Sequence, residues 1–439
     1  MTMSPIPDRL EGEPEFRPGG ALQVLLHVVQ LSIMLMLLLP VSIVCGLVYL
    51  PLRLNFSRPP MVVSPKLRRY YVSKALTAQA PHGAITVSMR LRVLLNIAIL
   101  VLAGPLLGLA WFADELLFPQ YRQTPIVRPL FQISGARSGS TQMTHYLEAH
   151  PQVVTPIFLQ QAFPYLWLWK LAPKTLGRLF SEEKVRSIFE KTLRPEFLQR
   201  HEFHPFKSDT FEIIYSSYQL VNLCMLLGPD VLAEGLGWAS STPDSAPFWE
   251  GEMVDMIDQL GRKVLYHAGP SEDGTPRVLL VKGHFLASAD TLESRFPDAH
   301  FLTIVRHPAQ RIRSLINFLR VAPDNNLNGA IPWSWLVAYA ERVEVAYCLR
   351  EKAWYEARPH TTTVIRFEDY VADIAGTLST IYARCLPDVS SEGCIPTEHA
   401  PRERQGYTIN RTLAQLNIDE EALLEPLQDY IIWCKSSSE

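Results

Sequence analysis

Two short stretches of the chain combine glycines, hydroxyls and guanidinium groups at spacings that suit phosphate binding. The first is the run Ser-Gly-Ala-Arg-Ser-Gly-Ser-Thr at 134–141, which follows an apolar stretch and precedes a helical pattern over 142–149. Where such a loop joins a strand to a helix, glycines let backbone N–H groups approach an anion, and the helix N-terminus adds partial positive charge. By itself the run also fits an ordinary Gly/Ser turn. Its candidate binding residues are Arg137, Ser138, Gly139, Ser140 and Thr141.

The second stretch spans 296–314. Arg306 stands at the carboxyl end of the apolar run 300–305, and Ser314 lies one or two turns into the helix expected next. A guanidinium at a strand end and a helical hydroxyl can bind one phosphate together. Arg311 and Arg313, in the same helix, are expected to form a solvated basic surface.

Together the two stretches resemble the sulfotransferases that use 3′-phosphoadenosine 5′-phosphosulfate (PAPS). The residues 137–141 resemble the 5′-phosphosulfate loop of that family, and 147–153 its continuation in the membrane and bacterial branches. The stretch from Val305 to Ser314 resembles the 3′-phosphate motif, and the likeness covers roughly 130–410. It implies PAPS as co-substrate, in-line displacement at sulfur without a metal, and a hydroxyl-bearing acceptor, either a glycan or a small molecule. It implies no nucleic acid partner.

A third motif resembles the Lys-x-His segment of the same family, in which the histidine is the catalytic base and the lysine assists the transferring group. Lys282 and His284 follow the apolar run 277–281. A neutral imidazole near pH 7 suits the removal of a hydroxyl proton. An ammonium group stabilises the negative charge that develops on a leaving oxygen. Arg404 resembles a late Arg-x-Gly segment over the 3′-phosphate, although a charged surface loop explains it equally well.

One departure from the family concerns an acid. Protein-tyrosine and some bacterial sulfotransferases place a glutamate soon after the first helix as a catalytic or acceptor-orienting group, whereas the segment 155–161 contains none. This weakens a tyrosine-sulfating function and leaves His284 as the favoured base, with His204 and Glu234 in reserve. Trp167 and Trp169 could line an acceptor cleft, but core packing explains them better.

Two other functions compete with a sulfotransferase. A nucleotide-binding membrane protein without catalytic activity would not need the chemistry that Arg137, Lys282, His284, Arg306 and Ser314 retain. A kinase or nucleotide triphosphatase is disfavoured because no lysine precedes the hydroxyls of the glycine run.

Strands that alternate with helices are expected to position these motifs. Apolar runs at 130–133, 277–281, 300–305 and 363–367 read as strands, and the patterns at 248–267 and 311–320 read as helices. This alternation predicts an α/β fold: a P-loop-like parallel sheet with helices on both faces. Ligands of such sheets bind beyond the carboxyl ends of the strands.

Two uncharged stretches precede this unit, and each is long enough to span a bilayer. We expect a flexible tail over 1–20, transmembrane helices at 21–50 and 93–113, a basic membrane-proximal loop at 51–92, a linker at 114–128 and a catalytic domain at 129–439. Pro40 is expected to kink the first helix.

Charge predicts the orientation of these helices. Between them lie eight basic residues and no acidic one, within a chain of net charge −3. The positive-inside rule places this loop in the cytoplasm and the catalytic domain on the far side of the bilayer, which in a eukaryotic cell is the Golgi lumen. The competing topology keeps the domain cytosolic, as a bacterial host would require for access to PAPS. In the lumen, Asn410 could be glycosylated and Cys385 could pair with Cys394, although two free thiols are equally compatible with the sequence. The sequence contains no Cys-x-x-Cys pair, so it does not indicate a zinc site.

Overall fold

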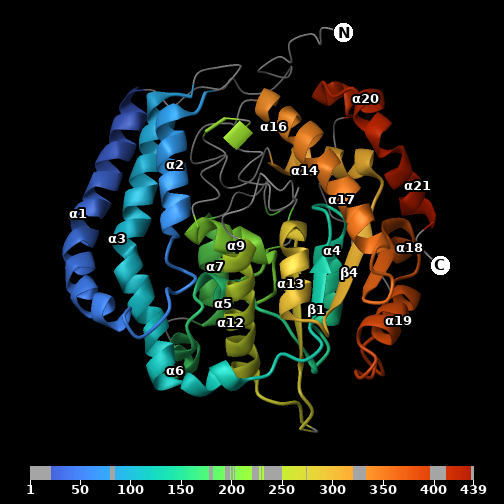
Figure 1. Ribbon diagram of the computed structural model, residues 1–439, viewed down its shortest axis with the longest axis horizontal. Helices are drawn as coiled ribbons and strands as arrows, with labels where there is room; N and C mark the ends of the chain where they lie inside the picture. The colour runs from blue at the N-terminus through green and yellow to red at the C-terminus, as the bar shows by residue number, and fades with distance from the viewer. Residues whose placement is uncertain are drawn as a thin grey trace.

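A computed structural model of the protein describes most of the chain. The described residues are 21–79, 85–176, 181–192, 198, 201, 203–219, 227–228, 230–231, 250–272, 274–319, 333–395 and 412–436. Three long N-terminal helices lie beside an α/β unit that encloses the sheet (Figure 1).

Five parallel strands form the sheet, in the order β2-β3-β1-β4-β5. The central strand β1 pairs with β3 through Leu130 and Leu280, and with β4 through Leu130 and His300. The predicted parallel sheet is therefore confirmed, and four strands lie within two residues of the predicted runs. The short β2 was not predicted. The strands are β1 (Leu130–Ile133), β2 (Val153–Val154), β3 (Val278–Gly283), β4 (His300–Val305) and β5 (Thr362–Arg366).

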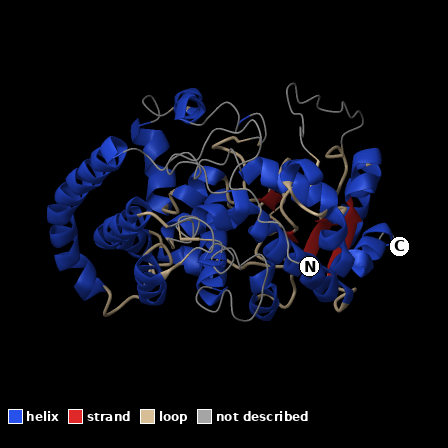
Figure 2. Ribbon diagram, turned by 90° about the horizontal axis from the view of Figure 1, so that it is seen from above, coloured by secondary structure: helices blue, strands red, loops and turns tan. Residues whose placement is uncertain are grey.

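Helices cover both faces of the sheet, as predicted, and successive residues of β1 show it. Leu130 packs in an apolar cluster with Met143 and Leu378, whereas Phe131 joins a larger cluster that contains Leu260. In Figure 2 the strands accordingly lie among helices. The helices that flank the sheet or lie near the candidate site are α4 (Ser140–Leu147), α6 (Leu166–Leu176), α9 (Phe211–Tyr218), α12 (Glu250–Ala268), α13 (Ala289–Arg295), α14 (Pro308–Leu319), α17 (Val345–Glu356), α18 (Phe367–Ala372) and α19 (Ile374–Cys385).

Further short helices complete the unit. They are α5 (Phe158–Ala162), α7 (Glu182–Thr192), α16 (Trp333–Tyr339), the π-helical turn η4 (Ala340–Glu344), α20 (Glu420–Leu424) and α21 (Gln428–Ser436), with the 3₁₀ turns η3 (Leu286–Ser288), η5 (Ala414–Leu416) and η6 (Glu425–Leu427).

The N-terminal layer consists of α1 (Ala21–Leu52), α2 (Pro65–Thr77) and α3 (Val87–Leu117). Two of these helices, α1 and α3, are long and apolar enough to cross a membrane. The basic loop between them also touches the α/β unit. Arg58 pairs with Glu252 of α12 at 2.7 Å, and the Gln219 amide donates to the Pro60 carbonyl at 2.5 Å.

Residues 114–128, predicted as a linker, are fastened to the α/β unit. The buried Asp114 carboxylate accepts the backbone N–H groups of Leu166 and Trp167, each at 2.8 Å. It also pairs with Lys263 of α12 at 2.9 Å. The segment then continues as the 3₁₀ helix η1 (Pro119–Gln123). The predicted domain boundary at residue 129 stays a prediction, but α3 and the sheet are joined by buried polar contacts rather than by a free hinge.

The predicted pairing of Cys385 with Cys394 and the predicted glycosylation of Asn410 both concern the C-terminal third of the chain. Cys385 and Cys394 are both free thiols in this structure, and burial raises the pKa of Cys385 to about 12. The predicted glycosylation site Asn410 lies outside the described residues.

Candidate active site

Three neighbouring strands end where the candidate residues lie. Because β3, β1 and β4 are adjacent and parallel, their carboxyl ends meet at one edge of the sheet. Ser134 follows β1, His284 follows β3, and Arg306 follows β4. The Ser134 N–H donates to the Gly283 carbonyl at 3.2 Å and its hydroxyl accepts from the Ile304 N–H at 3.0 Å, so these ends are joined directly.

The glycine loop adopts a conformation that presents the start of α4. Gly139, the residue before α4, has φ = +92°, which a residue with a side chain rarely adopts. The buried Gln132 of β1 donates to the Ser140 carbonyl at 3.2 Å and accepts a hydrogen bond from the Thr144 hydroxyl. The strand thereby fixes the first turn of the helix whose N-terminus faces the site.

The loop also contains an unsatisfied polar atom. The Ser138 side chain is fully buried, and its hydroxyl has no hydrogen-bond partner among the described residues. Buried hydroxyls nearly always find a partner, so an orphan next to a helix N-terminus suits a missing acceptor such as a phosphate oxygen.

The two predicted phosphate motifs come together. Arg137 donates to the Ser314 hydroxyl at 3.1 Å, and Arg306 donates to the Arg137 carbonyl at 2.9 Å. The Arg306 guanidinium also stacks on the Phe367 ring, 4.2 Å from its centroid. Arg137 itself has φ = +68°, a left-handed conformation that the neighbouring contacts hold in place. The fold therefore brings together Arg137 and Ser314, which are 177 positions apart in the sequence. Their roles stay predictions.

Arg311 was wrongly predicted to be solvated. Its side chain is fully buried, with Glu344 at 3.1 Å and Glu351 at 3.3 Å. Gly135 of the glycine loop lies against its guanidinium so closely that a Cβ would stand 2.1 Å from Nη1. Helical periodicity places Arg311 on the inner face of α14, where two carboxylates from later helices neutralise it. No local pattern in the sequence predicts those two partners.

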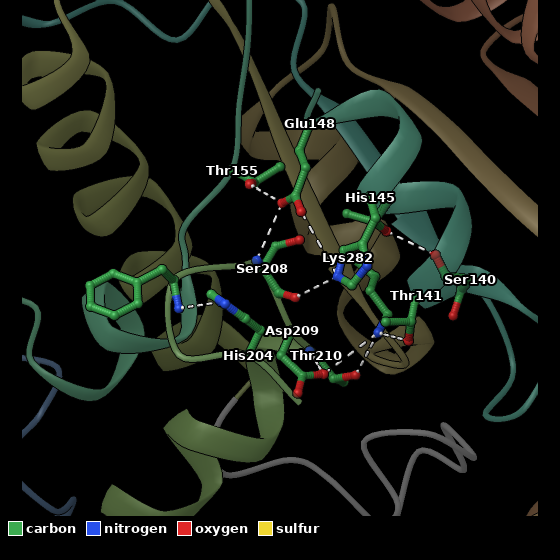
Figure 3. Close-up of polar contacts among 12 residues, drawn as sticks. Ser140, Thr141, His145, Glu148, Thr155, His204, Ser208, Asp209, Thr210 and Lys282 are labelled. Carbon is green, nitrogen blue, oxygen red and sulfur yellow. Dashed lines mark hydrogen bonds and ion pairs between the residues drawn. The ribbon is translucent and has the colours of Figure 1, made fainter. Parts of the chain in front are cut away.

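Lys282 lies at the centre of a buried polar cluster, shown in Figure 3. Its ammonium donates to the hydroxyls of Thr141 at 2.6 Å and Thr210 at 3.0 Å, and Asp209 lies 3.7 Å away. Burial lowers the pKa of Lys282, while the charge of Asp209 acts against that shift. The predicted lysine is thus tied to the predicted glycine loop through Thr141.

Asp209 was not predicted. Burial alone would raise the pKa of this carboxyl, but His201, 2.9 Å away, and Lys282 together hold it below its usual value. Asp209 therefore remains ionised at neutral pH. The only sequence signal was a short polar run before α9, which is common at helix starts.

His284 is held in one tautomer. Its Nδ1 lies 2.6 Å from the Ser134 carbonyl oxygen. A carbonyl oxygen only accepts, so Nδ1 carries the proton and Nε2 keeps a lone pair. Burial and then the Lys282 charge lower the pKa of the ring to about 3, so it is neutral at physiological pH.

A second carboxyl, Glu212, supports this histidine. It is fully buried in α9 and accepts the His284 backbone N–H at 3.0 Å. Burial raises its pKa to about 8, so it is largely protonated at neutral pH. This residue was also missed, because an acidic residue in the first turn of a helix normally indicates a solvated position.

A carboxylate lies close to the segment 155–161, in which this sequence lacks the glutamate of the family pattern. Glu148, at the end of α4, accepts hydrogen bonds from the Thr155 hydroxyl at 2.9 Å and the Ser208 N–H at 3.2 Å. Its other oxygen is 3.8 Å from His145. Figure 3 shows Glu148 with its contacts to Thr155, Ser208 and His145. The segment 155–161, which contains no acid, is thus bonded to a carboxylate through Thr155.

The positions of the reserve candidates say less about their roles. His204 accepts a hydrogen bond from the Phe206 N–H of its own loop at 3.2 Å. Trp167 and Trp169 donate their ring N–H groups to the carbonyls of Ala110 and Phe163. Glu234 and Arg404 lie outside the described residues.

A family model described as "Sulfotransferase family" matches residues 129–388, more than half of the chain. The site and sheet define an α/β protein in which a glycine loop joins the end of β1 to the start of α4. The chain belongs to the sulfotransferase family. No curated protein sequence matches the chain significantly.

Two solved structures share the fold. The sulfotransferase STF1 from Mycobacterium tuberculosis is 17% identical, with a TM-score of 0.55 over 82% of this chain and 92% of its own. The sulfotransferase STF9 from Mycobacterium avium is 16% identical, with a TM-score of 0.55 over 86% of this chain and 97% of its own. Both matches cover more of the chain than residues 129–439 contain, so the shared fold extends into the helices before residue 129.

Proposed function

We propose that this sulfotransferase moves a sulfuryl group from PAPS to the hydroxyl of a glycan or small molecule. The observation that carries the proposal is the meeting of three groups at adjacent strand ends. They are a glycine loop with an orphaned buried hydroxyl, a buried ammonium, and an imidazole whose lone pair is on Nε2. Phosphate binding, charge stabilisation and proton removal are the three tasks that such a transfer needs.

The residues present suit a nucleotide with two phosphate groups. Ser138, Gly139, Ser140 and Thr141 supply backbone and hydroxyl donors at the N-terminus of α4. Arg137, Arg306 and Ser314 lie within one hydrogen-bonded group, which suits a second phosphate. Arg404 stays a candidate for the same phosphate on the strength of the family resemblance.

When bound, PAPS would supply the sulfuryl group and a phosphate leaving group. His284 Nε2 would take the proton of the acceptor hydroxyl as its oxygen forms the bond to sulfur. The negative charge of a bound sulfuryl group would raise the low pKa of this ring and make it a better base. Lys282 would face the oxygen on which charge develops as the bond from sulfur to the phosphate oxygen breaks.

Replacement of the proposed base tests this mechanism. His284→Ala should lower transfer of labelled sulfate from PAPS by roughly 10²- to 10⁴-fold, with product-nucleotide affinity nearly unchanged. His300→Ala is the matched control, because His300 lies at the opposite end of β4 and contacts Thr363. Full turnover by His284→Ala would move the base elsewhere, and Glu148 and His204 would be examined next.

Nucleotide preference tests the binding residues. The product, 3′-phosphoadenosine 5′-phosphate, should raise the melting temperature more than ATP does, because ATP lacks a 3′-phosphate. Arg306→Ala should reduce the shift with the former nucleotide selectively. Equal shifts with both nucleotides would contradict the assignment of the second phosphate site.

Acceptor class separates the remaining alternatives. A panel of glycans, peptides, sterols and phenols, incubated with labelled PAPS and the full chain, should label a glycan or a small hydroxyl compound. Labelling of tyrosine peptides would favour protein-tyrosine sulfation, for which Glu148 is a possible acid. Tight nucleotide binding without any transfer would favour the inactive nucleotide-binding protein.

Membrane attachment belongs to the same proposal. The sequence predicts an integral membrane protein with two spans and a catalytic domain in the Golgi lumen. The apolar character of α1 and α3 supports an association with lipid. The two-span topology stays a prediction.

A further inference from the structure

The helices α1 and α3 run in the same direction. Near the end of α1, the Tyr49 ring occupies the space beside Gly108 of α3 and stacks on Phe112, 5.6 Å between centroids. Phe56, just after α1, lies 5.2 Å from the same Phe112 ring. The end of α1 therefore lies beside the last third of α3.

The burial pattern of α1 shows that this contact extends along the helix. The less exposed residues of its described part recur every three or four positions, which marks one stripe facing one neighbour. The stripe covers about 36 Å at 1.5 Å per residue. Only nine residues of α3 follow Gly108, so an antiparallel α3 could not match that length. The stripe contains Val28, Leu31, Leu35, Leu38, Ser42, Cys45, Tyr49 and Leu52.

The chain returns between the two helices through α2. At the far end, Arg90 near the start of α3 donates to the carbonyls of Ala75 and Ala78, at 2.7 and 2.6 Å. Figure 1 shows α1, α2 and α3 side by side in this arrangement. Residues 53–86 thus lead from the end of α1 back to the level of its beginning.

This path argues against two transmembrane spans. Consecutive spans joined by a loop on one side of a bilayer must run antiparallel. Parallel spans would require residues 53–86 to cross the hydrocarbon, although Lys66, Arg68, Arg69 and Lys74 lie in α2. Charged residues are costly there, and the irregular segments flanking α2 would expose unsatisfied backbone groups.

A single span by α1 meets a related difficulty. Because α1 packs on α3 along its length, α3 would enter the bilayer at the same depth. The α3 helix in turn contacts α2 and, through Asp114, the α/β unit. The basic loop binds the α/β unit as well, through Arg58 and Glu252. These contacts place the loop, α3 and the catalytic unit on one side.

We infer that α1 lies along the membrane plane, embedded in one leaflet, with α3 as its protein-facing support. This inference rests on the membrane association proposed above and replaces its topology. Apart from the stripe against α3, the described part of α1 is exposed and free of charge, which suits acyl chains rather than water. Arg53 directly follows α1, and Lys66 and Arg69 of α2 are exposed, which suits anionic headgroups nearby. The exposed apolar residues include Leu25, Val29, Ile33, Met36, Leu37, Ile43, Val44, Leu47 and Leu50.

Sidedness distinguishes the three arrangements. Single cysteines at Ser4, Ser57 and Ser379, in a full chain whose native cysteines are replaced by serine, would be labelled with an impermeant maleimide in sealed membrane vesicles. One-leaflet embedding predicts that all three positions react from the same side. Two spans predict that Ser57 alone differs, and a single span predicts that Ser4 alone differs. Either of these last patterns overturns the inference.

Lipid binding tests the apolar surface itself. We expect Leu37→Asp/Leu47→Asp to reduce flotation of the full chain with phosphatidylcholine/phosphatidylserine vesicles at least tenfold. The side chains of these residues are 67% and 73% exposed, so the fold should tolerate the change. Ile432→Asp is the matched control, because this residue is 63% exposed on α21. Unchanged flotation of the double variant, with the product nucleotide still raising its melting temperature, would overturn lipid contact by α1 while leaving the sulfotransferase proposal intact. If nucleotide stabilisation is absent from the native chain, the proposed function fails independently.

Discussion

Two lysines of this protein are buried to the same degree but have different partners. Lys263 of α12 pairs with Asp114 at 2.9 Å, donates to the Pro164 carbonyl at 3.0 Å and lies 3.1 Å from the centroid of the Trp111 ring. Lys282 at the end of β3 instead donates to two hydroxyls, and its nearest carboxylate is 3.7 Å away.

The difference is one of residual charge. Lys263 is neutralised by a close carboxylate, and its remaining donors are used within the protein, so it can only fasten α3 to the α/β unit. The partners of Lys282 are mostly neutral hydroxyls, and Asp209 is shared with His201. Lys282 therefore retains positive charge for an incoming anion. A buried cation becomes a candidate for chemistry when its partners orient it without neutralising it.

The largest expected effect is a loss of stability when Lys263 is replaced. Lys263→Met should destabilise the protein by ~3–5 kcal/mol, because Asp114 would remain buried without its counter-charge. Transfer per folded molecule should be unchanged. Urea unfolding of the purified chain, with activity normalised to the folded fraction, measures both quantities.

The double variant Lys263→Met/Asp114→Asn sharpens this test. It removes both charges and should recover part of the lost stability. A loss of transfer without a loss of stability in Lys263→Met would show that the two lysines do not differ as argued.

Replacement of Lys282 should have the opposite result, a large loss of transfer with a smaller loss of stability. Lys282→Met should lower transfer roughly 10²- to 10³-fold, because one donor to the developing negative charge disappears. Its cost in stability should be smaller than that of Lys263→Met, because Asp209 keeps His201 at 2.9 Å. Rapid-quench measurement of the transfer step, beside urea unfolding, separates the two effects. Equal stability losses and near-normal transfer would assign Lys282 a structural role.

These two lysines also show how far the sequence could predict this site. The position of Lys282 after an apolar run, together with the family resemblance, predicted that it lies at the carboxyl edge of the sheet. The structure places it beside the glycine loop because β3 pairs with β1. The same reasoning predicted that His284 and Arg306 lie at this edge, where they follow β3 and β4. Local patterns in the sequence therefore predicted those site residues that lie at the ends of strands.

Residues that depend on long-range packing were not predictable in this way. Asp209 and Glu212 reach the site from a loop and a helix that carry no motif, and Arg311 meets its carboxylates only after the later helices pack. The direction of α3 relative to α1 is equally a property of packing. Hydropathy gives the length of each helix but not whether the chain turns back between them.

A smaller effect concerns how Lys282 is oriented. Thr210→Val keeps the shape of the side chain but removes a hydroxyl that accepts from the ammonium at 3.0 Å. One such hydrogen bond contributes about 0.5–1.5 kcal/mol. We therefore expect transfer to fall by roughly three- to tenfold, with little change in nucleotide affinity. Thr303→Val, which removes a buried hydroxyl bonded to Glu351, is the control and should affect stability alone.

The smallest expected effect tests the protonated carboxyl behind His284. Burial raises the pKa of Glu212 to about 8, well above its value in the unfolded chain. The folded protein therefore binds more protons than the unfolded one between roughly pH 4.5 and 8, and this group makes stability fall as pH rises through that window. Glu212→Gln keeps a similar shape and can still accept the His284 N–H, but it cannot ionise. Its melting temperature should fall less than that of the native protein between pH 5.5 and 8.5, by about a few degrees. Glu392→Gln, at an exposed carboxyl, should retain the native slope. Identical slopes in all three proteins would mean that Glu212 is ionised in the folded state, and the carboxylate would then have to be counted with Asp209 among the charges that neutralise Lys282.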